Sequence, residues 1–313
     1  MNPALVVVGS LNMDFLVTVE RLPAPGETVL GRDFQMVPGG KGANQACAAA
    51  RLAGPSMTVR MVGRVGYDWF GDHLKAALAA VGVDVSSVHA TRAQATGVAL
   101  IWVDGSGQNS IVVAPGANHA LAASEMEGHR RSFQGTRFAL FQLEIPLPAV
   151  AAGLRIAREE GARTMLDPAP ARPLEREVLE LADVLTPNET EASLLVGRKP
   201  GRVAPADAPG LARALRQAGA RTVVLKLGDQ GCYYDDGHRQ IHQPAFPVDV
   251  RDSTAAGDTF NAALAVALCE GLPIERALRF ANAAAAISVT RLGAQASVPL
   301  RREVEEFLSL REA

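Results

Sequence analysis

The sequence predicts an α/β protein with a mostly parallel central sheet and a small antiparallel sheet attached to it. Short apolar runs typical of strands alternate with helix-like segments along the chain, which favours parallel strands covered by helices. The length of 313 residues suits one large α/β domain, and the content of 48% apolar but only 5% aromatic residues suits closely packed helices. We therefore expect a single α/β domain over residues 1–313.

Six apolar runs are expected to form the central sheet. Helical segments follow the first two of them, at about residues 43–52 and after Trp69, and polar residues tend to stand where the strands end. Active sites of such sheets lie at the carboxyl ends of the strands. The expected strands lie at residues 4–9, 58–63, 138–143, 162–167, 183–188 and 221–228.

Two segments depart from this alternation. Residues 14–20 alternate with period two and precede an extended stretch at 28–36, while residues 96–118 indicate a hairpin turning at the DGSG of 104–107. Together they predict a small sheet over about residues 12–36 and 94–116, placed as a lid over a site. Its apolar face would need cover, so we expect a homodimer formed through paired lids. The Pro-rich residues 199–209 are expected to form a surface loop.

Composition and charge exclude several classes of function. A formal net charge of −2 and a pI near 6.3 indicate no nucleic-acid partner. The cysteines, Cys47, Cys232 and Cys269, are far apart and suggest neither a disulfide framework nor a metal site, so we expect a cytoplasmic protein. No apolar run has the roughly 20 residues that a membrane span needs, and no membrane partner is expected.

The stretch RDSTAAGDTFNAAL, residues 251–264, combines a small-residue turn with the start of an apolar helix. In one interpretation Ser253 or Thr254 caps the helix and Asp258 lies in its first turn, where negative charge is favoured. In the other, free N–H groups at the helix start bind a phosphate and Asp258 accepts the proton of an attacking hydroxyl. These residues alone leave both open.

The stretch VPGGKGANQA, residues 37–46, is not a phosphate-binding P-loop, because Gln35 stands where its first glycine belongs and Gly42 follows Lys41. It predicts a Gly-rich turn that opens a helix, with Lys41 and Asn44 either contacting a small polyol or exposed to solvent. The first strand leads into SLNMD without a GxGxxG pattern, so a dinucleotide fold of the usual type is not expected.

Polar residues at strand ends predict a polar pocket. Asn12 and Asp14, spaced by two, suit vicinal sugar hydroxyls, with a simple Asx turn as the alternative. Glu144 and Asp167 also end strands. In TPNETEA, residues 186–192, Asn188 and Glu191 either cap a helix or orient a hydrated Mg²⁺ near phosphates.

These motifs, in this order, resemble the ribokinases of the ribokinase-like sugar kinase family over nearly the whole chain. The resemblance implies a three-layer fold with a β lid, and ATP-dependent phosphorylation of D-ribose at its 5-hydroxyl with Mg²⁺ and an activating K⁺. A related kinase for deoxyribose, fructose, a keto-deoxy sugar acid or a nucleoside is the alternative. A non-catalytic sugar-binding regulator and a dinucleotide oxidoreductase are less favoured. The motifs are GSLNMD, GGKGANQA, TGVALI, PGAN, QLE, DPAPA, TPNETEA, LGDQG, DSTAAGDTFNAAL and RLGAQASVP.

The resemblance also implies roles for individual residues, with Asp258 as the general base. The N–H groups of Ala255, Ala256 and Gly257 would form the anion hole. Sugar contacts would come from Asn12, Asp14, Gly40, Lys41, Gly42, Asn44, Glu144 and Asp258. The nucleotide and its Mg²⁺ would be bound by Asn188, Glu191, Gly228, Gly231, Gly257 and Asn282. The monovalent cation would be held by Asp252, Thr254, Ser288, Arg291, Gly293 and Ser297. One departure stands out: Lys226 occupies a position where ribokinases commonly carry Thr.

Overall fold

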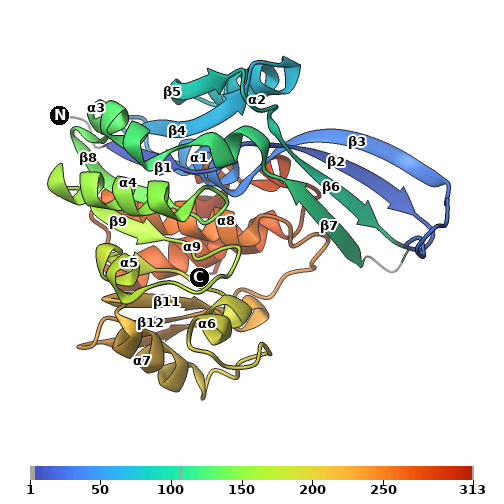
Figure 1. Cartoon of the computed structure of the whole chain (residues 1–313). Coiled ribbons are helices and arrows are strands. Elements are labelled where there is room, and N and C mark those ends of the chain that lie inside the picture. The colour runs from blue at the N-terminus through green and yellow to red at the C-terminus, as the bar shows by residue number, and fades with distance from the viewer. Residues whose placement is uncertain (1–3, 106–107, 312–313) are drawn as a thin grey trace.

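A nine-stranded sheet runs through the middle of the molecule, with helices on both faces (Figure 1). The computed structural model describes residues 4–105 and 108–311, and gives this sheet the order β13-β12-β11-β10-β9-β8-β1-β4-β5. All pairs from β11 to β5 are parallel, and β12 and β13 add an antiparallel edge. The predicted fold class is confirmed. The strands are β1 (Ala4–Val8), β4 (Thr58–Gly66), β5 (Val83–Thr91), β8 (Thr136–Phe141), β9 (Arg163–Leu166), β10 (Val184–Leu185), β11 (Thr222–Lys226), β12 (Cys232–Asp235) and β13 (Gln240–Gln243).

Hydrophobic clusters on the two faces of this sheet form the core. One contains the buried sides of α1, α8 and α9, and the other those of α4, α5 and α7. The many alanines of α1, α8 and α9 let the helix backbones approach closely, because a methyl side chain takes up little space between them. The α-helices are α1 (Lys41–Leu52), α2 (Trp69–Ala80), α3 (Arg130–Phe133), α4 (Leu147–Glu159), α5 (Arg176–Leu181), α6 (Glu189–Leu195), α7 (Ala208–Ala218), α8 (Ala256–Cys269), α9 (Ile274–Ser288) and α10 (Arg301–Ser309). Short 3₁₀ helices are η1 (Gly116–Ala120), η2 (Ala123–His129), η3 (Gly228–Gln230) and η4 (Gln295–Ser297).

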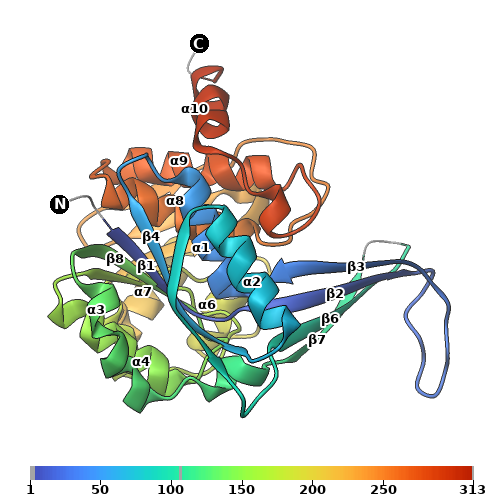
Figure 2. The same ribbon diagram turned by 90° about the horizontal axis from the view of Figure 1, so that it is seen from above.

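A second sheet of four strands projects from this body (Figures 1 and 2). Its order is β3-β2-β6-β7, with β2 (Asn12–Val19), β3 (Gly31–Gly39), β6 (Gly97–Val103) and β7 (Asn109–Ala114). The β2–β3 and β6–β7 pairs are antiparallel, as the sequence predicts, and the predicted hairpin is the β6–β7 pair. The central β2–β6 pair is parallel, because the chain enters both strands from the central sheet, β2 after β1 and β6 after β5. Part of the DGSG turn, residues 106–107, lies outside the described residues.

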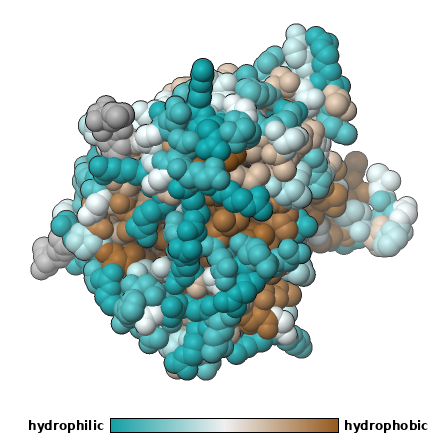
Figure 3. Space-filling view, turned by 60° about the vertical axis from the view of Figure 1, so that its left-hand side comes forward, coloured by the Kyte–Doolittle hydropathy of each residue, from teal (hydrophilic) through white to brown (hydrophobic). Residues whose placement is uncertain are grey.

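The two faces of this small sheet differ. Asp14 shares one face with its neighbours across the strands, Ala99 and Val113. Phe15 shares the opposite face with Leu100 and Val112, both of which are exposed, together with Met36 at the edge. Figure 3 shows hydrophobic surface on the projecting sheet at the right of the view. One face therefore includes a carboxylate, and both faces leave apolar side chains in solvent, Val113 on the Asp14 face and Leu100 and Val112 on the other.

The remaining segments agree with the sequence in kind and differ in extent. The loop expected at 199–209 gives way to α7 at Ala208, where Pro209 takes the first turn of the helix, a position that tolerates a missing N–H. The strand expected at 183–188 has ladder pairing only at Val184–Leu185. Among the described residues, no helix is both long and apolar enough to cross a bilayer.

Candidate active site

Asp258 is the centre of the site. It lies in the first turn of α8 and is buried, with one carboxylate oxygen accepting a hydrogen bond from the Asn44 side chain at 3.1 Å and the other from the Gln45 side chain at 3.0 Å. Both amides come from α1, which packs against α8. Two adjacent residues of one helix thus hold the carboxylate in a fixed orientation.

Gln45 links Asp258 to a second buried carboxylate. The same Gln45 amide nitrogen donates to Asp167 at 3.1 Å, and the Gln142 amide nitrogen donates to the Gln45 oxygen at 2.6 Å. On its other oxygen Asp167 accepts from the Lys226 ammonium at 2.9 Å. The result is a continuous chain of polar contacts from Asp258 to the end of β11. Gln45 and Gln142 are absent from the predicted site residues, whereas Asp167 is among the strand-end acids predicted for the polar pocket but has no predicted role.

The start of α8 has no side-chain cap, so the capping role considered for Ser253 or Thr254 is wrong. The N-cap residue is Ala255, with φ 58° and ψ 13°, and among the described residues it is the one non-glycine with positive φ. Such a left-handed conformation costs energy and is found where a site requires it. The Ala256 N–H donates to the Ser253 carbonyl at 3.2 Å, whereas those of Ala255 and Gly257 have no protein acceptor within the described chain. Uncapped N–H groups at a helix start are suited to an anion.

The Gly-rich turn before α1 brings Lys41 beside the acids. Glu144 accepts hydrogen bonds from the Lys41 main-chain N–H at 3.0 Å and from the Ser10 hydroxyl at 2.5 Å. Gly42 touches the end of β1, where a methyl group on it would lie 2.6 Å from the backbone of Gly9 and Ser10. Glycine is required here because two backbones meet, and this contact places the Lys41 side chain at the carboxyl end of β1.

Asn12 and Asp14 are placed by β2 beside the Gly-rich turn, where a methyl group on Gly39 would meet the Asp14 carboxylate and one on Gly40 would meet the Asn12 backbone. The Asn12 side-chain oxygen accepts from Asn118 at 2.8 Å, so a residue of the PGAN motif holds it. One oxygen of Asp14 is buried and lacks a hydrogen-bond partner among the described residues. An unpaired buried acceptor is costly, and it marks a place where the donor of a ligand would fit.

The pKa values of these groups reflect burial and mutual repulsion. Burial, with Glu144 and Asp258 nearby, raises the pKa of Asp14 to about 7. Burial raises the pKa of Asp258 to about 6, Asp167 adds to the rise, and Lys41 and the two amides oppose it. Burial lowers the pKa of Lys41, but the surrounding carboxylates, chiefly Asp258, outweigh burial and raise it. Clustered acids with displaced pKa values are typical of a catalytic site.

A pocket of about 400 Å³ opens from Asp258 toward α6 and the start of α8. On its far side, Asn188 and Glu191 form a capping box: Glu191 accepts from the main-chain N–H and the side chain of Asn188, at 2.8 and 2.9 Å. Of the two interpretations of Asn188 and Glu191 from the sequence, the structure therefore shows helix capping. Burial raises the pKa of Glu191, while Lys226 opposes the rise. The residues lining the pocket are Lys41, Asp167, Ala169, Asn188, Glu189, Thr190, Glu191, Lys226, Gly228, Ser253, Ala255, Gly257 and Asp258.

The predicted nucleotide residues Gly228, Gly231 and Asn282 lie on one side of this pocket. Gly228, which lines it, begins the 3₁₀ turn η3, and Gly231 ends that turn. The Asn282 side chain donates to the carbonyls of Gln243 and Pro244 at 3.1 and 3.0 Å, and a methyl group on Gly231 would meet that same segment. Gly228, Gly231 and Asn282 thus build one wall with β13, rather than pointing polar atoms into the pocket.

The residues predicted for a monovalent cation come together behind the start of α8. The carboxylate of Asp252 accepts from the N–H groups of Thr254 and Gly293, both at 2.8 Å, and these bonds lower its pKa against the effect of burial. The hydroxyls of Ser288 and Ser297 donate to nearby carbonyls, and Arg291 pairs with Glu303. Hence Asp252 and the surrounding carbonyls are the groups available to a cation, whereas the Arg291 side chain is engaged elsewhere.

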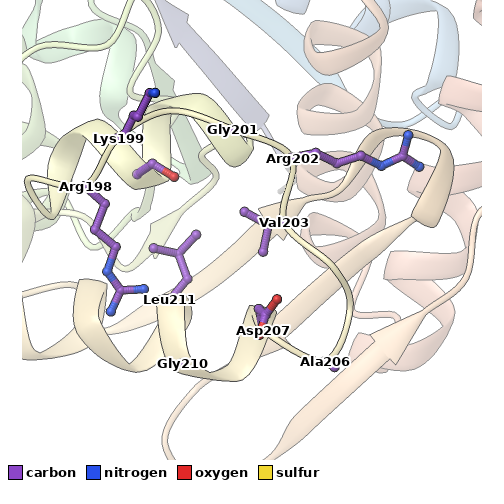
Figure 4. A pocket seen from close by; sticks show the side chains of 10 residues that line it. Arg198, Lys199, Gly201, Arg202, Val203, Ala206, Asp207, Gly210 and Leu211 are labelled. Atoms are coloured by element: carbon purple, nitrogen blue, oxygen red, sulfur yellow. The ribbon is translucent and has the colours of Figure 1, made fainter.

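A second hollow of about 430 Å³ lies between α6 and α7 (Figure 4). Arg198, Lys199 and Arg202 line it, but their side chains point in different directions. Arg202 is engaged by Asp229, which lies in η3. No set of polar groups converges there, so this hollow is not the catalytic pocket.

Comparison with known proteins agrees with this geometry. The family model of pfkB family carbohydrate kinases matches residues 2–301. The chain belongs to the pfkB family of carbohydrate kinases. This pfkB-family chain is 43% identical to the ribokinase of Bacillus subtilis over 305 residues, covering 97% of this chain and 99% of that one. It is 40% identical to the ribokinase of Haemophilus influenzae over 311 residues, covering 98% and 99%.

Among solved structures, one of Arabidopsis thaliana ribokinase complexed with ribose and ATP matches this pfkB-family chain with a TM-score of 0.89 at 36% identity. The match covers 98% of this chain and 99% of that one. The ribokinase of Thermotoga maritima matches with a TM-score of 0.88 at 37% identity, with the same coverage. The resemblance stated from the motifs is therefore confirmed for family and fold.

Proposed function

We propose that this chain transfers the γ-phosphoryl group of ATP to the 5-hydroxyl of D-ribose. The observation that carries the proposal is the position of Asp258, a buried carboxylate between a pocket of acids on one side and an uncapped helix start on the other. Full-length similarity to ribokinases, one of them solved with ribose and ATP, supports this sugar and this nucleotide.

The sugar would be bound at the ends of β1 and β2. Asp14 has an acceptor without a partner, and Asn44 has an unpaired buried oxygen, so each can accept from a sugar hydroxyl. The remaining proposed sugar contacts are Asn12, Gly40, Lys41, Gly42 and Glu144. The small sheet would close over these residues as a lid, with the face that includes Asp14 toward the sugar. The lid predicted at about residues 12–36 and 94–116 corresponds to strands that lie within 12–39 and 97–114.

Asp258 would act as the general base. It accepts the proton of the 5-hydroxyl as that oxygen attacks the γ-phosphorus; the new O–P bond forms, and the bond to the bridging oxygen breaks with its electron pair leaving on ADP. The N–H groups of Ala255, Ala256 and Gly257 would stabilise the charge on the phosphoryl oxygens. The Ala256 N–H would have to exchange its turn contact with Ser253 for the phosphate.

The nucleotide and ions would occupy the remaining residues. Gly228, Gly231 and Asn282 would form the nucleotide wall, with Asn188 and Glu191 near the phosphates. A Mg²⁺ ion would neutralise phosphate charge, with Glu191 contacting its waters, since Mg²⁺ keeps most of its hydration shell. The residues present suit a Mg²⁺ ion held through its waters and the phosphates. No cluster of three or more His, Cys, Asp or Glu side chains suited to a metal is found in the described ranges.

The cation site and the assembly complete the proposal. K⁺ would lie between Asp252 and the loop that contains Gly293, with carbonyls such as that of Thr254; Ser288, Arg291 and Ser297 would contribute through their backbone. The exposed apolar face of the small sheet would be covered in a homodimer. A cytoplasmic location belongs to the same proposal, as do sugar and ATP as the small-molecule partners.

The test is ADP release in Mg²⁺ and K⁺ buffer with D-ribose, 2-deoxyribose, fructose, 2-keto-3-deoxygluconate and adenosine side by side. D-ribose should be preferred by at least tenfold in kcat/KM over 2-deoxyribose, because a pocket that bonds a hydroxyl rejects an analogue lacking it. ³¹P NMR of the product should show phosphorus coupled to a CH₂ group. ADP release with only another acceptor would contradict ribose as the substrate. No ADP release with any of the five acceptors would contradict the proposed kinase activity.

A further inference from the structure

Lys226 is a charged residue of the pocket to which the proposed mechanism assigns no role. It is the last residue of β11, and its main-chain N–H donates to the Pro187 carbonyl at 2.9 Å, which anchors it beside Asn188. Its side chain is 13% exposed and lines the pocket. Lys226 is thus largely shielded from solvent beside a phosphate-sized space, where an ammonium group needs a partner because its burial is costly unless it is paired.

The ammonium group of Lys226 stands over the open start of α8. A methyl group placed on Gly257 would lie 3.4 Å from the Nζ atom. The N–H of Gly257 has no acceptor in the described part of the chain. An anion bound there would therefore lie within hydrogen-bond reach of Lys226.

Asp167 holds the ammonium in this place and leaves it with free donors. The Nζ–Oδ1 distance is 2.9 Å, and Asp167 is itself buried and fixed by Gln45. A lysine ammonium has three N–H donors. One is used by Asp167, so two remain to contact oxygens of a ligand.

The side chains around the pocket carry an excess of negative charge, so a cation near the phosphates would be stabilising. Carboxyl groups outnumber ammonium groups there, and the phosphates of a nucleotide would add further negative charge. Lys41 lines the same pocket, and its ammonium group interacts with several of these carboxylates, chiefly Asp258, so it does not balance the charge alone. The carboxyl groups are those of Asp14, Glu144, Asp167, Glu191 and Asp258, and the ammonium groups are those of Lys41 and Lys226.

We propose that Lys226 is a phosphate-binding residue of this active site, held by Asp167 over the start of α8 so that it contacts the transferring phosphoryl group of the nucleotide. This inference rests on the proposed kinase function and deepens it. Lys226 neutralises charge on the phosphoryl oxygens together with the N–H groups of residues 255–257, and it takes no proton from the sugar. At this position the resemblance to ribokinases implies a Thr, so the chain uses a charge where those relatives use a hydroxyl.

The experiment compares wild type with Lys226→Met, Lys226→Thr and Lys226→Arg, and uses Lys199→Met, an exposed lysine of the second hollow, as the matched control. Kinetics with saturating ribose should show kcat/KM for ATP lowered about 10- to 100-fold in the Met variant, with KM for ribose within twofold of wild type. The Arg variant should regain at least part of the loss, and Lys199→Met should match wild type.

Equilibrium binding separates a phosphate contact from general damage. AMP-PNP, a non-hydrolysable ATP analogue that keeps the γ-phosphoryl group, should bind at least fivefold more weakly to Lys226→Met and Lys226→Thr, whereas adenosine affinity stays unchanged.

Unchanged ATP kinetics in the variants would overturn the inference, as would an equal loss of AMP-PNP and adenosine affinity. If Lys226→Met fails to fold, as judged by thermal melting, Lys226→Thr carries the test, since Thr suits this position in relatives. Ribose-dependent ADP release by wild type is measured first, so failure of the proposed function is seen independently.

Discussion

Asp258 lies between the sugar side and the phosphate side of the site. Its burial and its hydrogen bonds shift its pKa in opposite directions. Burial favours the neutral acid, while Asn44, Gln45 and Lys41 favour the carboxylate. The balance leaves a pKa near 6, close enough to neutrality for the group to accept a proton and release it again.

Replacing Asp258 with Asn should lower turnover at least about 10³-fold, because no group remains to accept the proton. Ribose affinity by calorimetry should change little, since the amide keeps most of the shape. In wild type, kcat/KM should fall as the pH drops through about 6, where Asp258 becomes protonated. Turnover unchanged by D258N would contradict the role of base.

Asp14 is expected to lower the folding stability of the ligand-free protein at neutral and alkaline pH. Its folded pKa of about 7 exceeds the ordinary value of 3.8 for an aspartic acid side chain, so between these pH values the folded state binds more protons and stability falls as the pH rises. Asp14→Asn should therefore stabilise the free protein at pH 8 by roughly 1–3 kcal/mol and by less at pH 5, while weakening ribose binding.

Thermal melts at the two pH values check this expectation for Asp14, with the exposed Asp33→Asn of the neighbouring strand β3 as control. Equal effects of the Asp14 and Asp33 substitutions at pH 8 would show that burial of Asp14 carries no cost.

At the scale of elements, α1 positions the site through its contact with β1. Gly42 lies where the helix start meets the backbone of Gly9 and Ser10, neither of which can move aside as a flexible side chain would. Gly42→Ala should cost roughly 2–4 kcal/mol of stability and most of the activity.

The control for Gly42 is Gly210→Ala in α7, where a methyl group meets no atom within 4 Å. That substitution should be neutral or stabilise by up to about 1 kcal/mol, because alanine is the better helix former. Chemical denaturation and ADP release measure both. Equal stability of the two variants would mean that the α1–β1 contact can relax.

The loop before α8 and the loop after α9 act as a second pair of elements, joined by Asp252 and Gly293. If a monovalent cation lies between them, replacing K⁺ with Na⁺ should lower kcat several-fold by loosening the start of α8. Asp252→Asn should remove most of the difference between the two salts. Equal wild-type rates in both salts would count against the site.

At the scale of the whole molecule, the projecting sheet has more apolar surface than its own chain covers. Phe34, Met36, Leu100 and Val112 are between 41% and 59% exposed. A second copy of the sheet would cover this face, and closed two-fold pairing is the common solution for such surfaces.

Val112→Glu should convert a dimer to a monomer in analytical ultracentrifugation, because two buried charges would face each other across the symmetric contact. KM for ribose should rise as the lid loses support. Leu310→Glu, an exposed position at the end of α10, should leave the dimer intact. A wild-type protein that sediments as a monomer would refute the assembly.

Much of the architecture was predictable from short stretches of sequence. The period of the apolar residues distinguished strands from helices, and the motifs placed Asp14, Glu144 and Asp258 at element ends, because such signals depend on near neighbours in the chain. The parallel β2–β6 pair was not predictable, since residues 14–20 and the hairpin at 96–118 are joined through the body of the fold.

What the sequence by itself determined is the fold class, the family and the polar residues at the ends of strands and helices. Only the tertiary structure decided that Gln45 holds Asp258 and Asp167 together, that Lys226 pairs with Asp167, and that the start of α8 is left uncapped. These are contacts between side chains far apart in sequence, as with Gln45 and Asp258, separated by 213 positions. No local pattern encodes such a pair, because its geometry arises only when α1, α8 and the central sheet have packed.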